Sequence, residues 1–179
     1  AMALNDTGAN DATLYLSDLP VKSRDLNWKI RQLVEAIEES RYYFDQLKSR
    51  KDAPRRPLRK IILSAPGRRE LASAEQAVRE GVAISAGMAL AKDLGNLPPN
   101  ICTPSYLAEQ AQALALEFPA LRVKVLDEAE MEQLGMGALL SVTRGSAQPA
   151  KLIRLAFRRG PATAKPYMLV GKGVTFDTG

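Results

Sequence analysis

The sequence contains no histidine and a single cysteine, and these two scarcities limit the chemistry that its side chains can support. Without histidine, the 179 residues cannot form a Ser-His-Asp triad or a histidine-ligated zinc site. The lone Cys102 excludes an internal disulfide and any Cys-x-x-Cys redox or zinc site. A single thiol is typical of a reducing compartment, so we expect a cytoplasmic protein.

Long hydrophobic runs and a strong charge of one sign are also missing. No uncharged run reaches the ~18 residues that a membrane span needs, and the N-terminus lacks a basic region followed by an apolar one. We therefore expect neither a membrane segment nor a secretory signal. The 25 basic and 20 acidic residues give a formal charge of +5, which permits contact with nucleic acid without arguing for it. The apolar share of 46% is enough for a packed core.

The pattern of apolar residues predicts an α/β fold that begins with a strand, a helix and a second strand. We expect strands at Thr13–Leu19 and Leu58–Ser64. Between them, an apolar stripe with steps of three and four predicts a helix of about 25 residues, with Ser23 as its N-cap. This βαβ unit should have a right-handed crossover. We interpret residues 1–69 as the C-terminal part of a small N-terminal α/β domain.

A second long helix is predicted over Glu70–Leu94, in a connecting segment 70–95, and its small side chains suit a connection between two domains. Gly95 and the two prolines that follow predict its end. Residues 96–179 then alternate in the manner of a mixed or parallel-sheet α/β domain. Local signals there are a helix capped by Thr103, a strand at Leu121–Leu126, a capping box of Asp127 with Glu130, a strand at Lys151–Arg159, and an apolar central strand at Tyr167–Val170.

The chemistry-bearing feature of the sequence follows that last strand. Lys172 and Asp177 lie five residues apart among several glycines, at the carboxyl end of a strand, where open α/β sheets place their ligands. The segment does not fit a phosphate-binding loop, because Gly173 instead of serine or threonine follows the lysine. From residue types alone, a structural ion pair, an acid–base pair and a metal site all stay open.

Three stretches in this order resemble the leucyl aminopeptidase (cytosol aminopeptidase) family of two-metal exopeptidases. They are VGKGVTFDTG at residues 170–179, AKDLGNLPPNICTPSYLA at 91–108 and LGMGALLSVTRGS at 134–146. The basic stretch PRRPLRK at 54–60 further resembles the bacterial aminopeptidase A branch. The resemblance spans essentially the whole chain, and it implies that residues 96–179 are the first part of a catalytic domain.

The resemblance implies a metal-dependent aminopeptidase that releases N-terminal residues, with a leucine-type preference, through water activated by two metal ions. Lys172 then binds one divalent ion (manganese or zinc, or magnesium), and Asp177 bridges both. A lysine can bind a cation only through its neutral amine, and a bridging carboxylate holds two ions ~3.5–4 Å apart. In the family, the other ligands, the catalytic lysine and the arginine that orients a bicarbonate lie beyond the position of Gly179. No catalytic residue is therefore assigned within this chain.

The same resemblance implies peptide substrates with a free N-terminus and a homohexamer for the intact enzyme. We expect this chain to be a fragment of that enzyme, inactive by itself and weak in metal binding. The alternative is a DNA-binding accessory protein for transcription or recombination, because some bacterial members of this branch bind DNA. Its candidate residues are the basic ones of the segment 48–60: Lys48, Arg50, Lys51, Arg55, Arg56, Arg59 and Lys60. A solvated loop is the simpler interpretation of such a run.

Overall fold

The computed structural model describes residues 2–5, 7–50 and 58–175 of the chain. Contacts divide the chain into two compact units, residues 1–96 and residues 97–179. The proposed domain limits at residues 69 and 95 stay predictions. Within the described residues, no helix is both long and apolar enough to cross a membrane.

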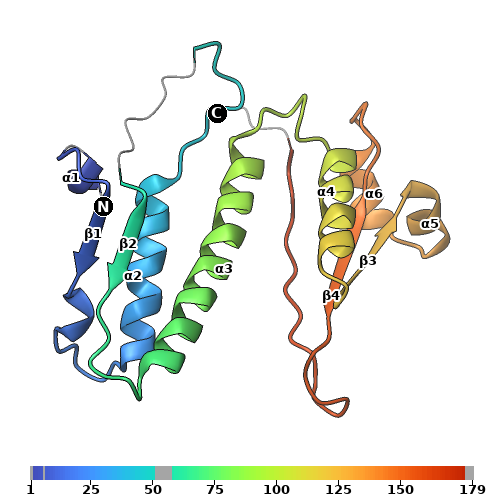
Figure 1. Ribbon diagram of the computed structural model, residues 1–179. Helices are drawn as coiled ribbons and strands as arrows, with labels where there is room; N and C mark the ends of the chain where they lie inside the picture. The colour runs from blue at the N-terminus through green and yellow to red at the C-terminus, as the bar shows by residue number, and fades with distance from the viewer. Residues whose placement is uncertain (1, 6, 51–57, 176–179) are drawn as a thin grey trace. The chain divides into compact units, whose positions relative to one another are not determined.

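The first unit is a two-stranded parallel sheet with two long helices beside it (Figure 1). A short helix α1 (Met2–Asn5) precedes β1 (Asp11–Leu14), which pairs in parallel with β2 (Lys60–Leu63), so that Asp11 lies beside Lys60. The connection between the strands contains the 3₁₀ helix η1 (Leu16–Asp18) and α2 (Leu26–Arg41). The predicted strand–helix–strand unit is therefore present.

The boundaries of the first strand and helix differ from the sequence prediction. Strand β1 ends at Leu14, and residues predicted to extend it form η1 instead, where the buried Ser17 hydroxyl donates to the Ser64 carbonyl at 2.7 Å. The N-cap of α2 is Asp25, whose carboxylate accepts the Trp28 amide at 2.8 Å. Ser23 has a φ of 60°, outside the extended region that an N-cap adopts.

Helix α2 ends at Arg41, earlier than the predicted limit near residue 47, because Tyr42 turns extended. Helix α3 (Leu71–Asn96) matches the predicted second helix, although Gly95 lies inside its last turn and not beyond it. The core of the unit lies between α2 and α3. It consists of Ile30 and Val34 from α2 with Ala74 and Ala77 from α3.

The described part of the second unit, residues 97–175, contains two antiparallel strands and three helices. Helix α4 (Pro104–Glu117) has Thr103 as its N-cap and proline at its first position, as predicted. Strand β3 (Leu121–Leu126) pairs with β4 (Leu152–Phe157), and α5 (Glu128–Gln133) and α6 (Gly137–Thr143) lie between them in the chain. The capping box of Asp127 with Glu130 is confirmed.

The small core of the second unit is centred on Met131, which is fully buried. Leu126 and Ala150 pack with it, and the Glu128 carboxylate accepts the Ala150 amide at 2.8 Å. Leu155 and Phe157 in β4 are 51% and 65% exposed. At the other end of β4, Leu152 is half-buried and packs against this core.

Candidate functional site

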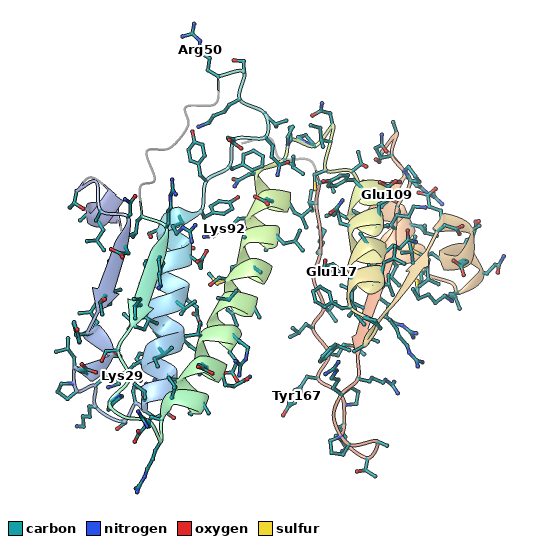
Figure 2. The ribbon with its side chains drawn as sticks, viewed as in Figure 1. Lys29, Arg50, Lys92, Glu109, Glu117 and Tyr167 are labelled. Atoms are coloured by element: carbon teal, nitrogen blue, oxygen red, sulfur yellow. The ribbon has the colours of Figure 1, made fainter. Side chains whose placement is uncertain are left out.

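The segment that carries Lys172 is irregular and exposed. Tyr167–Val170, the predicted central strand, forms no strand, and its four side chains are between 82% and 100% exposed (Figure 2). The prediction of a strand was wrong for this chain because an extended segment becomes a strand only by pairing, and this one pairs with neither β3 nor β4. Contiguous exposed apolar residues of this size mark a surface that normally contacts other protein.

Lys172 is exposed, and Asp177 lies outside the described residues. The donor chemistry of a lysine amine and a carboxylate fits a divalent cation, but a zinc ion normally takes about three protein ligands. Among the described residues, no group of three or more histidine, cysteine, aspartate or glutamate side chains could supply the rest.

The basic segment is exposed wherever the structure describes it. Lys48, Arg50, Arg59 and Lys60 are exposed, and Figure 2 shows Arg50 projecting away from the helices of the first unit. The Lys48 ammonium donates to the Tyr43 hydroxyl and lies 4.3 Å from the centre of that ring. Lys51, Arg55 and Arg56 lie outside the described residues. The exposed positive charge agrees with a solvated loop and with an anion-binding surface alike.

An apolar cavity of about 290 Å³ lies in the first unit between β2, α2 and α3. Aliphatic side chains such as Ile61, Leu63 and Val78 line most of it, and the charged groups at its lining are Glu38, Arg41, Arg59 and Glu75. Among the described lining residues there is no serine, threonine, cysteine or histidine and no metal-ligating cluster, so the cavity does not suggest a reaction centre.

The aromatic residues that flank the apolar stripe of α2 each contact a different cation. The Arg24 guanidinium lies 4.7 Å from the centre of the Trp28 ring, and the Lys92 ammonium lies 4.9 Å from the centre of the Tyr42 ring. Together with the pair of Lys48 and Tyr43, these contacts place one cation over each of three separate aromatic rings.

One polar cluster was not predicted from the sequence. The Tyr42 hydroxyl donates to Asp93 Oδ1 at 2.9 Å and accepts from Asn96 Nδ2 at 2.9 Å. These partners are more than 50 positions away in the chain, and no motif links them. The only available signal was the position of Tyr42 near the end of a long helix.

Comparison with protein families matches both parts of the chain. The model of the cytosol aminopeptidase family, catalytic domain, matches residues 89–179, and that of the N-terminal domain of the same family matches residues 1–51.

Curated relatives with this description are similar over almost the entire chain. A probable cytosol aminopeptidase of Thioalkalivibrio sulfidiphilus is 58% identical over 179 residues, which is 100% of this chain and 36% of that protein. A cytosol aminopeptidase of Vibrio cholerae serotype O1 is 49% identical over 177 residues, covering 98% of this chain and 35% of the relative. The chain thus spans about a third of the length of the curated relatives it matches.

Solved structures give the same picture. A mutant of tomato leucine aminopeptidase matches 99% of this chain and 35% of its own with a TM-score of 0.79 at 26% identity. The bottromycin maturation enzyme BotP in complex with Mn matches 86% of this chain and 31% of its own, with a TM-score of 0.67 at 27% identity. The match to the tomato structure agrees with the predicted mixed α/β fold.

Proposed function

The chain belongs to the cytosol aminopeptidase family, and from this premise we propose that its protein is an aminopeptidase that releases N-terminal residues, leucine-type ones preferentially, from peptides. The observation that carries the proposal is the match of the catalytic family model through residue 179, the stretch that includes Lys172 and Asp177. Substrates are peptides with a free N-terminus. The intact enzyme is a homohexamer in the cytoplasm, which light scattering and cell fractionation can test.

We assign Lys172 and Asp177 as ligands of two divalent metal ions. An amine nitrogen and a carboxylate are both suitable donors for manganese, zinc or magnesium, and the similar enzyme BotP was solved with Mn. When bound, such ions supply Lewis acidity and activate water for attack on a peptide carbonyl. Lys172 contributes one lone pair through its neutral amine, whereas Asp177 has two oxygens and can serve both ions. Bicarbonate and the catalytic lysine and arginine remain expectations for the rest of the enzyme.

Substitution of the two ligands in the full-length enzyme tests this assignment. Asp177→Ala should abolish turnover of an N-terminal leucine substrate and lower the content of both ions, measured by elemental analysis. Lys172→Ala should lower the occupancy of one ion preferentially. Lys165→Ala is the matched control, since Lys165 is an exposed lysine seven residues earlier in the same irregular segment. Wild-type turnover and full metal content in both ligand variants would overturn the assignment.

The 179 residues alone are proposed to be inactive. They provide two of the proposed ligands, and the apolar side chains of Tyr167–Val170 are left exposed. A purified 19.5 kDa species that bound metal tightly and turned over peptide would contradict this proposal.

The alternative function, DNA binding through the basic segment, rests on the exposure of Lys48, Arg50, Arg59 and Lys60. Binding through phosphate contacts weakens steeply as salt rises, because neutralised phosphates release counterions. A gel shift at several salt concentrations should therefore weaken in an Arg50→Ala, Arg59→Ala double variant. Arg122→Ala, an exposed arginine on β3, is the control. Equal DNA binding by the wild type and the double variant, or no binding by the wild type, would contradict DNA binding through the basic segment.

A further inference from the structure

The two long helices of the first unit are held together differently along their length. The buried residues of α3 are Ala74, Ala77 and Gly81, all in its N-terminal half. Beyond them, a half-open cavity of about 280 Å³ lies between α2 and α3, and Glu35, Glu39, Val82 and Ala89 line it together with Tyr42 and Lys92. The C-terminal half of α3 therefore has no buried apolar side chain that would hold it against α2.

Polar side chains at the wall of this cavity connect the helices. Tyr42, at the end of α2, bonds through its hydroxyl to Asp93 and to Asn96, both in the last turns of α3. Lys92 lies over the Tyr42 ring and also pairs with Glu39 of α2; Figure 2 labels Lys92 near the end of α3. We call these five residues the Tyr42 clamp.

The clamp joins the two segments that the family models match separately. Glu39 and Tyr42 belong to residues 1–51, matched by the N-terminal domain, whereas its members on α3 belong to residues 89–179, matched by the catalytic domain. Four contacts between these segments are therefore made by Tyr42 and its neighbours, inside a single compact unit: two hydrogen bonds, one cation–π contact and one ion pair.

We propose that Tyr42 is a positioning residue whose hydroxyl and ring hold the last turns of α3, where the catalytic segment begins, against the end of α2. The hydroxyl serves as donor and acceptor at once, so one group satisfies a carboxylate and an amide. The ring provides the face on which the Lys92 ammonium rests while it pairs with Glu39. Phenylalanine keeps the ring but loses both hydrogen bonds. This role is the local ordering of the helix end, and it is independent of the proposed peptidase activity.

Amide hydrogen exchange in the full chain tests the proposal, because local opening of a helix end raises exchange there without unfolding the rest. In Tyr42→Phe, amides of residues 92–96 should exchange about ten times faster, in line with the loss of hydrogen bonds to a charged and a neutral partner. Amides of residues 74–81 should keep their wild-type rates. Tyr43→Phe is the matched control, since the adjacent hydroxyl accepts from Lys48 and its loss should leave residues 92–96 unchanged.

Reciprocal substitutions on α3 complete the test. Asp93→Ala should also raise the exchange rate at residues 92–96. In the Asp93→Ala background, Tyr42→Phe should raise that rate by a smaller factor than it does in the wild type, because the two residues share one hydrogen bond. Unchanged exchange of the last turn in Tyr42→Phe would overturn the proposal. So would an equal acceleration along the whole of α3, since that result would mean a general loss of stability.

Discussion

Gly81 on α3 lies so close to Val34 on α2 that a Cβ atom at position 81 would be 2.8 Å from the Val34 Cβ. The Val34 Cγ1 and the Arg31 carbonyl oxygen would lie 3.0 Å and 3.3 Å away. Glycine is therefore required by the close approach of the two helices, and not by its backbone conformation.

Gly81→Ala should destabilise the first unit by about 1–3 kcal/mol, the usual cost of inserting a methyl group into a packed contact. Chemical denaturation measures the change. Gly87→Ala is the control within the same helix: no atom lies within 4 Å of its added Cβ, so the gain in helix propensity should stabilise the chain by roughly 0.5–1 kcal/mol. Equal effects of the two substitutions would contradict the close approach.

The N-cap of α2 gives a second prediction. Asp25→Ala should reduce the free energy of unfolding by about 1 kcal/mol, because the Trp28 amide loses its acceptor. Ser23→Ala should have little effect, although serine is an equally good N-cap by residue type. A larger loss from Ser23→Ala than from Asp25→Ala in thermal denaturation would place the start of the helix where the sequence pattern first suggested.

Tyr42 should make stability depend on alkaline pH. Desolvation and the hydrogen bond to Asp93 raise the pKa of its phenol above the ordinary 10.0, while Asn96 and Lys92 act in the opposite direction. The raised pKa favours the neutral phenol in the folded state, so its contribution is complete below pH 10 and is lost as the pH rises through the folded pKa. Ultraviolet titration of the wild type and Tyr42→Phe should differ by one late-ionising tyrosine. A difference spectrum that titrates below pH 10 would contradict this.

Cys102 should react slowly with alkylating reagents. Its side chain is buried, and desolvation raises the pKa of the thiol, so the reactive thiolate is scarce at neutral pH. We expect alkylation at pH 8 to be at least roughly ten-fold slower than for the denatured chain. Equal rates with and without denaturant would show that the thiol is accessible.

The features that could be predicted from the sequence are those that depend on interactions between residues a few positions apart. The Thr103 cap with its following proline and the capping box at Asp127 depend on neighbours three positions away, and both are present. The start of α2 was misplaced because Ser23 and Asp25 are both good caps, and only the left-handed φ of Ser23 separates them.

Features that depend on distant partners could not be predicted in this way. The apolar run at residues 167–170 has the composition of a strand, but strand formation requires a neighbour that no local pattern identifies. The bond of Tyr42 to Asp93 joins residues 51 positions apart. For Lys172 and Asp177, residue types left an ion pair, an acid–base pair and a metal site open, and the metal assignment came from resemblance to a family.

The parallel pairing of β1 with β2 has a consequence for the order in which the chain folds. Asp11 pairs with Lys60, 49 positions later, whereas Leu126 at the near end of the antiparallel pair meets Leu152 after 26 positions. Closing the longer loop costs about 0.6 kcal/mol more in chain entropy, since the cost grows with the logarithm of loop length. The loop also contains α2, whose apolar face must pack against α3 before the helices can stabilise the strand pair. The β3–β4 ladder should therefore acquire its contacts in an earlier kinetic phase than the β1–β2 ladder.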